Sequence, residues 1–293
     1  MELPDVKFHG NLTYNDWLME WFGFHAGRDM LIFNRDAVKG SQKFYDRPSS
    51  ILWFVRYCKK YNKPAYLSVN PRTEHNVVYG VERIFFDFDA HKPSEQDRVV
   101  CDTRRFVASL YPVKPLVVKS MRGYHVYLFF KQGVLKVGDN RLAKEFYQSC
   151  QQLLLNGNNY RTLDRNVLGD VKRLSRVPLS WHELGGWVTI VDENLEPTKV
   201  RSLDFYRTYG LDSEFVNRTV RLMILTREKR EQQQRHATPP PQGIFKIRPC
   251  FEYALNRHEM SHQQRLALVS EAFWVGLSED EIINLFTNLR DYN

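Results

Sequence analysis

One apolar run carries two carboxylates two residues apart: Val81-Glu82-Arg83-Ile84-Phe85-Phe86-Asp87-Phe88-Asp89. A run of this length and hydrophobicity is typical of a buried strand. Successive side chains of a strand point to opposite faces, so Asp87 and Asp89 share one face, opposite Phe86 and Phe88. The run therefore predicts a buried strand that ends in two acids on the same face.

Two ionised carboxylates in this arrangement lie roughly 7 Å apart along the backbone. They repel each other and lose hydration unless a cation lies between them. Hard oxygen ligands of this kind suit Mg²⁺ or Mn²⁺, with substrate phosphates completing the coordination shell. The alternative is a strand that simply ends in solvent, with both acids hydrated.

The composition indicates a folded protein with an anionic partner. Hydrophobic residues make up 43% and aromatic residues 14% of the 293 residues, which allows a substantial core. The 42 Lys and Arg residues outnumber the 34 Asp and Glu residues, giving a net charge of +8. This excess favours nucleic acid over a neutral metabolite as the partner.

The four cysteines lie far apart and form no C-x-x-C pair: Cys58, Cys101, Cys150 and Cys250. Neither a zinc knuckle nor a disulfide framework is therefore indicated. The first residues lack the basic and apolar order of a signal peptide, and no apolar run is long enough to span a membrane. We expect a soluble protein of the cytoplasm.

Hydrophobic spacing predicts helices mixed with β structure, that is, an α/β (α+β) chain. The predicted helices cover residues 50–61, 95–110 and 141–155, the second with Ser94 as its N-cap. The predicted strands cover residues 64–71, 81–89, 115–120, 124–130 and 185–191, the third and fourth forming a hairpin across a turn at 121–123.

Polar side chains gather at the turn of this hairpin. Ser120, Arg122 and His125 lie beside Gly123. A hydroxyl, a guanidinium and an imidazole next to a glycine can form a phosphate cradle, because glycine lets the backbone approach and arginine binds phosphate in a planar fork. The alternative is a polar hairpin tip in which His125 bonds to backbone.

A third acid, Asp164, ends the short strand-like segment that begins at Tyr160. Lys172, Arg173 and Arg176 follow and form a basic edge near it. Taken alone, Asp164 would be an ordinary turn residue.

Four segments taken together are similar to the signature motifs of a known group of enzymes. They are Asp87-Phe88-Asp89, Ser120 to His125, Asp164, and Arg173-Leu174-Ser175-Arg176-Val177-Pro178-Leu179-Ser180-Trp181-His182. In order and spacing they resemble the motifs of the archaeo-eukaryotic primase superfamily, which includes the catalytic small subunit of primase and the primase-polymerases of plasmids and viruses.

The resemblance implies a role for each matched residue. Asp87, Asp89 and Asp164 would bind two divalent cations, Mg²⁺ or Mn²⁺. The triphosphate of the incoming nucleotide would be contacted by Ser120, Arg122 and His125, with Arg176 and His182 alongside and Arg173 in support. Such a set agrees with nucleotidyl transfer, in which metal ions and fixed cations stabilise charge on the phosphate oxygens.

The resemblance also implies a fold: a catalytic core with an RRM-like half and an N-terminal αβ half, followed by a small all-helical domain. Many relatives carry a zinc knuckle between the second and third motifs, and the cysteines here cannot form one. The turn at 120–123 has one Arg where some relatives have two basic residues. The chain is therefore expected to lie nearest the primase-polymerases of mobile elements.

Residues 1–235 are predicted to form the catalytic domain, 236–243 a Pro-rich linker, and 244–293 a helical module. Two amphipathic helices are expected in the module, over 263–274 and 279–289. Gly276 is predicted to close the first, and Ser278 with Glu281 to form a capping box for the second.

The module is similar to the start of the C-terminal domain of the primase large subunit and to its accessory relatives without a cluster. Cys250 matches the first of four iron-sulfur ligands there, but the other three have no counterpart, so no cluster is predicted. The likeness implies that Arg257, His262 and Arg265 contact the template or the initiating nucleotide. A small packing cap is the alternative. A helicase downstream in a longer chain is also expected.

The sequence thus predicts a template-directed DNA primase-polymerase, a nucleotidyltransferase that starts and extends primers on single-stranded DNA from NTPs or dNTPs. A gap-filling repair polymerase and a non-catalytic nucleic-acid-binding subunit remain alternatives. A phosphohydrolase of the haloacid-dehalogenase type is disfavoured, because it needs a small hydroxyl residue soon after the second acid and Ala90-His91-Lys92-Pro93 follow Asp89.

Overall fold

The computed structural model describes residues 6–21, 30–33, 42–45, 48–72, 77–78, 80–137, 139–182, 184–236, 261–274 and 276–286. The chain divides into two compact units, Met1–Leu225 and Thr226–Asn293. The predicted domain limits at residues 235 and 244 stay predictions, since 237–243 lie outside the described part.

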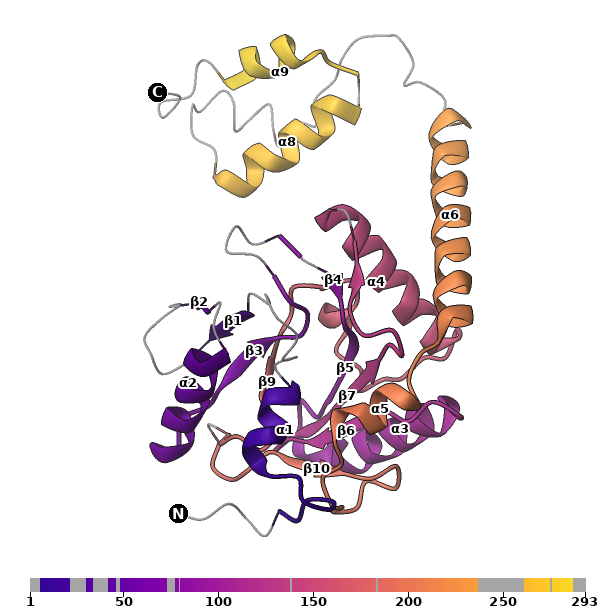
Figure 1. The fold of residues 1–293 in the computed structure, drawn as a ribbon. Coiled ribbons are helices and arrows are strands. Elements are labelled where there is room, and N and C mark those ends of the chain that lie inside the picture. The colour runs from indigo at the N-terminus through magenta and orange to yellow at the C-terminus, as the bar shows by residue number, and fades with distance from the viewer. Residues whose placement is uncertain are drawn as a thin grey trace. The chain divides into compact units, whose positions relative to one another are not determined.

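The first unit mixes helices and antiparallel sheets, which confirms the predicted fold class (Figure 1). Its helices are α1 (Tyr14–Trp21), α2 (Pro48–Lys60), η1 (Pro93–Glu95), α3 (Gln96–Ser109), α4 (Asn140–Leu155), η2 (Arg165–Val167), α5 (Leu203–Thr208) and the first part of α6 (Ser213–His236). Its strands are β1 (Met30–Phe33), β2 (Gln42–Tyr45), β3 (Tyr66–Ser68), β4 (Gly80–Val81), β5 (Arg83–Asp89), β6 (Leu116–Lys119), β7 (Gly123–Phe129), β8 (Leu135–Lys136), β9 (Leu174–Arg176) and β10 (Thr189–Val191).

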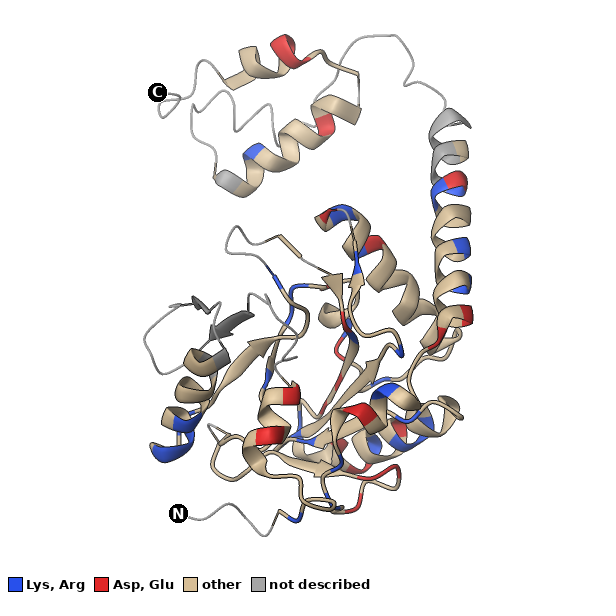
Figure 2. Ribbon diagram, viewed as in Figure 1, with Lys and Arg blue, Asp and Glu red and all other residues tan. Residues whose placement is uncertain are grey.

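Among the described residues of this unit, two four-stranded sheets form, one in the order β2-β1-β3-β9 and one in the order β10-β6-β7-β5. The hairpin of β6 and β7 forms as predicted, and β5 pairs with β7 along its whole length. Helix α2 ends in the basic residues Lys59 and Lys60, and this end of the helix is blue in Figure 2.

The predicted strand over 81–89 is two strands in the structure, because the β pairing is interrupted at Glu82. Its backbone amide donates to the side-chain oxygen of Asn70 at 2.9 Å. Its buried carboxylate contacts Nη2 of Arg83 at 2.8 Å and Nη2 of Arg207 at 3.4 Å. This inward carboxylate separates β4, which pairs with β8, from β5 in the main sheet.

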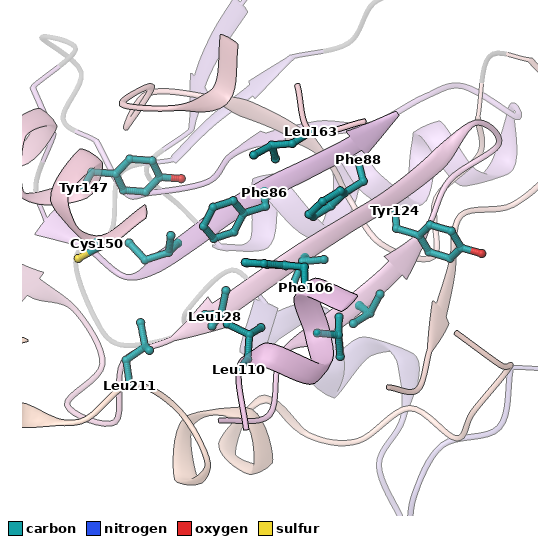
Figure 3. Packing of buried hydrophobic residues seen from close by; sticks show 14 of the residues in the cluster. Phe86, Phe88, Phe106, Leu110, Tyr124, Leu128, Tyr147, Cys150, Leu163 and Leu211 are labelled. Atoms are coloured by element: carbon teal, nitrogen blue, oxygen red, sulfur yellow. The ribbon is translucent and has the colours of Figure 1, made fainter. Parts of the chain in front are cut away.

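The two faces of β5 enter two different cores, as the alternation predicted. Phe86 and Phe88 pack against Phe106 of α3, with ring centroids 4.6 and 5.4 Å apart (Figure 3). Tyr147 and Cys150 of α4 belong to the same cluster. Helices α3 and α4 thus cover this face of the sheet, and the acids of β5 point to the other.

On the other face, Phe85 joins a second core that draws on α1, α2, α5 and the sheet containing β3. Trp21 of α1 lies edge-on against Tyr127 of β7, 5.0 Å between centroids. This core is built between the two sheets, and the candidate site lies beside it.

Helix α3 begins differently from the prediction. Ser94 lies inside the short helix η1 and does not cap α3. Instead the carboxylate of Glu95 accepts the backbone amides of His91 and Lys92, at 3.0 and 3.2 Å. The Ser94 prediction was wrong because the chain enters the helix through an extra tight turn.

The second unit contains α8 (His262–Trp274) and α9 (Glu279–Phe286), as predicted. Leu268 and Ala272 of α8 pack with Ile282 and Phe286 of α9. The capping box is confirmed: the amide of Ser278 donates to the Glu281 carboxylate at 2.7 Å, and the Glu281 amide to the Ser278 hydroxyl at 3.4 Å. Gly276 has φ +88°, a conformation that favours glycine after a helix. Within the described ranges, no helix has the length and apolar character needed to cross a bilayer.

Candidate active site

A pocket of about 160 Å³ opens beside the ends of β5, β7 and β9. Its lining comprises Tyr66, Phe85, Asp87, Asp89, Ser120, Arg122, His125, Arg173, Leu174, Ser175, Arg176 and His182. All residues predicted for metal and triphosphate are in this lining, except Asp164, which lies next to it. Segments far apart in the sequence therefore meet in one place.

The strand β5 positions the first two acids. Asp87 is paired in register with His125 of β7, and Asp89 with Gly123 at the start of β7. The carboxylate of Asp89 forms an ion pair with Nη2 of Arg122 at 2.8 Å. Both acids thus lie at the hairpin turn, where the strand leaves the core.

The third acid is held by backbone hydrogen bonds. The amide of Asp164 donates to the carbonyl of Asp87 at 2.8 Å, and the amide of Asp89 donates to the carbonyl of Thr162 at 2.9 Å. The predicted strand-like segment is reduced to one antiparallel bridge between Leu163 and Phe88 of β5, and no regular strand ends at Asp164. Asp164 caps η2 instead, its carboxylate accepting the amide of Asn166 at 2.9 Å.

A buried carboxylate of α3 fixes this loop. Oδ2 of Asp102 accepts the amide and the hydroxyl of Thr162, each at 3.1 Å. Asp102 was not predicted as a site residue. The signal was present, because Asp102 lies on the apolar face of α3 between Val99 and Phe106, and a charged residue there needs a buried partner.

Burial disfavours the charged forms of the first two acids. Desolvation raises the pKa of Asp87 from 3.8 to about 6, with the neighbouring Asp164 adding to the rise and Arg173 opposing it. Burial likewise raises the pKa of Asp89, while Arg122 opposes the rise. The anion of Asp87 is therefore under-stabilised without a further cation nearby.

The donor set fits divalent cations in an open site. Carboxylate oxygens suit Mg²⁺, which is commonly held by one or two carboxylates together with substrate phosphates and water. Within the described residues, no group of three or more Asp, Glu, His or Cys side chains lies close enough together to hold a metal ion, so a cation here would take its other ligands from substrate phosphates and water. The observation that favours a cation here is the poor solvation of the Asp87 anion. The two neighbouring carboxylates already form ion pairs, Asp89 with Arg122 and Asp164 with Arg173.

The hairpin turn is fixed by its own hydrogen bonds. The Ser120 hydroxyl accepts the amide of Gly123 at 3.1 Å. A Cβ on Gly123 would lie 1.7 Å from the carbonyl oxygen of Phe88, so no other residue fits. The glycine thus permits close approach of β5 and β7, and Ser120 holds the turn that presents Arg122.

His125 lies in the pocket as a neutral imidazole. Burial, together with the nearby charge of Arg176, lowers its pKa from 6.5 to about 3. Its Nε2 is 3.6 Å from Oδ1 of Asp87, a contact between a neutral ring and a carboxylate and not an ion pair. The hydroxyl of Tyr127 is 3.5 Å from its Nδ1.

The strand β9 and the residue before it supply two arginines. Arg173 lies 3.3 Å from Oδ2 of Asp164. Arg176 donates to the hydroxyl of Tyr66 at 2.6 Å and stacks over the Tyr66 ring, 4.5 Å from its centroid. Tyr66 was missed by the sequence reasoning, because it reaches the pocket only through the pairing of β3 with β9.

His182 is oriented by the loop that follows it. Its Nδ1 accepts the amide of Leu184 at 3.0 Å, which assigns the proton of the neutral ring to Nε2. Trp181 and Trp187 pair edge to face beside it, 5.5 Å between centroids. His182 is thereby a hydrogen-bond donor in the pocket wall.

The residues predicted to contact template lie in the second unit, and the structure describes only some of them. Arg257 and Cys250 lie outside the described residues. His262 begins α8 but its side chain is not described, and Arg265 lies half-buried on the same helix. Their predicted contact with template stays a prediction.

Solved structures that are similar to this chain include two of a primase. One is the crystal structure of primase RepB′, with a TM-score of 0.46 and 12% identity over 92% of this chain and 84% of that chain. The other is the catalytic domain of primase RepB′ in complex with initiator DNA, with a TM-score of 0.40 and 13% identity over 76% of this chain and 97% of that chain. No protein-family model and no curated protein matches the sequence.

Proposed function

We propose that this chain is a template-directed DNA primase-polymerase, a nucleotidyltransferase acting on single-stranded DNA. The observation that carries the proposal is the meeting of Asp87, Asp89 and Asp164 with Arg122 and Arg173 beside one pocket. Three acids against several fixed cations are the groups that phosphoryl transfer from a nucleoside triphosphate requires. The motif order of the sequence supports the same interpretation.

The subdomain layout that we propose follows from the same resemblance. The sheet β10-β6-β7-β5 with α3 and α4 would be the RRM-like half. The sheet β2-β1-β3-β9 with α1 and α2 would be the N-terminal αβ half. The pocket lies where residues of both sheets are close, with β9 and β3 facing the ends of β5 and β7.

The acids would hold two divalent cations, Mg²⁺ or Mn²⁺. When bound, these ions would lower the pKa of the attacking 3′-hydroxyl and neutralise charge on the leaving pyrophosphate. Binding would relieve the buried anion of Asp87 and release Arg122 and Arg173 from their carboxylate partners. These arginines, with Arg176, would then contact the triphosphate oxygens.

The two histidines would act as neutral donors and not as acid-base catalysts. The low pKa of His125 keeps its ring uncharged at physiological pH, so it can donate one N–H hydrogen bond to a phosphate oxygen. His182 would donate from Nε2. Ser120 positions the turn through Gly123.

The test is incorporation of labelled nucleotide on single-stranded DNA, with Mg²⁺ or Mn²⁺ and with ribo- and deoxynucleotides in turn. We expect product from unprimed template, and its loss in Asp87→Ala and Asp89→Ala with DNA binding nearly intact. Asp97→Ala, an exposed acid on α3, is the matched control and should retain activity. Incorporation by the Asp87→Ala/Asp89→Ala variant would remove these acids from the mechanism.

The same assay separates the alternatives. Synthesis on a primed gap but not on unprimed template would favour a gap-filling repair polymerase. DNA binding without incorporation under any of these conditions would favour a non-catalytic subunit.

A further inference from the structure

Helix α2 carries a row of aromatic side chains that the pocket does not use. Trp53 stacks on Tyr57 with centroids 5.5 Å apart and planes at 22°, and Tyr57 lies 4.8 Å from Tyr61. Successive members are four positions apart, so Trp53 and Tyr57 lie on one face of the helix. Tyr61, the first residue after the helix, continues this face, its amide donating to the carbonyl of Tyr57 at 3.1 Å. We call Trp53, Tyr57 and Tyr61 the aromatic row.

The outer rings of this row face solvent. Trp53 is 64% exposed and Tyr61 53% exposed, whereas Tyr57 packs partly against the core. The core thus holds the middle ring, which in turn orders the rings on either side. Exposed large aromatics cost solvation, and a fixed row of them indicates a partner.

The charge around the row is of one sign. Residues 48–63 contain Arg56, Lys59, Lys60 and Lys63 and no acid. Lys60 lies 5.4 Å above the ring of Tyr61. Within the described part of the chain, none of these four cations forms an ion pair with a carboxylate. Lys59 lies 4.6 Å over the Tyr14 ring, which leaves Arg56, Lys60 and Lys63 for an anionic partner.

Alternating rings and cations are the two elements of a surface for single-stranded nucleic acid. Bases stack on aromatic rings whatever their sequence, and Lys and Arg follow the phosphates. An acidic protein would match the charge but would gain little from flat stacked rings. Duplex DNA would match the charge but presents no free base faces.

We propose that the aromatic row with Arg56, Lys60 and Lys63 binds single-stranded DNA outside the catalytic pocket. The choice of DNA rests on the proposed function, whereas the single-stranded character rests on the rings. Helix α2 leads directly into β3, which carries Tyr66 of the pocket. Tyr66 follows Tyr61 by five positions, so their Cα atoms are at most about 18 Å apart, and one strand can reach both.

The helix end gives the row a defined boundary. Asn62 has φ +52°, and the amide of Lys63 donates to the carbonyl of Cys58 at 2.7 Å. This turn closes α2 directly after Tyr61.

The test is the affinity of the full chain for fluorescent oligo(dT), measured by anisotropy at several salt concentrations. Trp53→Leu/Tyr61→Leu keeps apolar bulk but removes both exposed rings, and it should bind roughly tenfold or more weakly. Trp53→Phe/Tyr61→Phe keeps ring faces and should bind almost as the unmodified chain does. Tyr111→Ala, which removes an 82% exposed ring elsewhere, is the matched control and should leave affinity unchanged.

The cations are tested through the salt dependence. Arg56→Gln/Lys60→Gln should reduce the slope of log affinity against log salt by roughly 0.7 for each phosphate that the variant no longer neutralises. Unchanged thermal unfolding of each variant shows that the fold is retained. Leu and Phe variants that both bind like the unmodified chain would overturn the proposal, as would equally weakened binding in the two.

These outcomes are distinct from failure of the proposed function. Binding that depends on the row, in a chain that incorporates no nucleotide, would keep this surface and reject the polymerase. Nucleotide incorporation by a chain whose DNA binding does not depend on the aromatic row would keep the polymerase and reject this surface.

Discussion

The backbone amide of Asp164 donates a 2.8 Å hydrogen bond to the carbonyl oxygen of Asp87. This bond joins a loop acid to a strand acid through the backbone, without using either carboxylate. Arg173, just before β9, and His125 of β7 then approach them. The position of Asp164 therefore depends on the loop backbone and on what holds that loop.

Asp102 is the residue that holds the loop, and we predict that Asp102→Ala lowers nucleotide incorporation strongly. The substitution leaves the buried amide of Thr162 without its acceptor and should cost about 1–3 kcal/mol of stability. Asp102→Asn keeps one acceptor oxygen and should restore part of the activity. Incorporation and urea unfolding are measured on both, with the exposed Asp97→Ala as control. Equal activity in Asp102→Ala and the control would show that the loop needs no anchor.

Asp87→Asn should raise stability at neutral pH while abolishing activity. The folded-state pKa of Asp87, about 6 against an ordinary 3.8, means that the native state binds this proton more tightly than the unfolded state. The resulting destabilisation is absent below pH 4, grows as pH rises through 6, and amounts to roughly 3 kcal/mol at most.

Urea unfolding in a metal-free buffer at pH 4, 6 and 8 checks this sign. The advantage of Asp87→Asn should appear at pH 8 and vanish near pH 4. Added Mg²⁺ should stabilise the unmodified chain more than the variant. A stability advantage of Asp87→Asn that is the same at every pH would mean that ionisation of the Asp87 carboxyl is not its cause.

Gly123→Ala should unfold or severely destabilise the first unit. Its Cβ would meet the Phe88 carbonyl oxygen at 1.7 Å, so β5 and β7 would have to separate where Asp89 lies. We expect a decrease in stability of about 3 kcal/mol or more. Gly133→Ala is the control: its φ is +78° but nothing lies within 4 Å of the added atom, and about 1 kcal/mol is expected. Thermal unfolding of the two variants gives the comparison, and similar melting temperatures would contradict the predicted clash.

Glu82→Gln should destabilise the protein by about 3–5 kcal/mol, because it removes a buried charge beside two arginines. Glu82 and Arg83 are each 1% exposed, and Arg207 contacts the same carboxylate. Asp204→Asn is the control, since this 78% exposed acid also pairs with Arg207 and should contribute at most about 1 kcal/mol. Chemical denaturation measures both. A small change in the free energy of unfolding for Glu82→Gln would mean that the charge of this carboxylate is not required where β4 ends and β5 begins.

Much of the candidate site could be predicted along the chain because it depends on local periodicity. The alternation over residues 84–89 placed Asp87 and Asp89 on one face, and the hairpin of β6 and β7 placed Ser120, Arg122 and His125 at its turn. Helices α3, α4, α8 and α9 followed from apolar spacing. These features involve residues close in sequence, whose geometry is set by backbone repeat alone.

The remaining features come from contacts between distant segments, for which a single sequence holds no local signal. The pairing of β3 with β9 brings Tyr66 under Arg176, and the bond from Asp102 to Thr162 sets the place of Asp164. The carboxylate of Glu82 interrupts an apolar run whose pattern predicts one strand. The sequence by itself therefore determines which side chains share a strand face and where the turns fall. The acids and the cations come together only when the two sheets pack. The reason is that burial and hydrogen bonding select the contact partner of each of these residues from the whole chain.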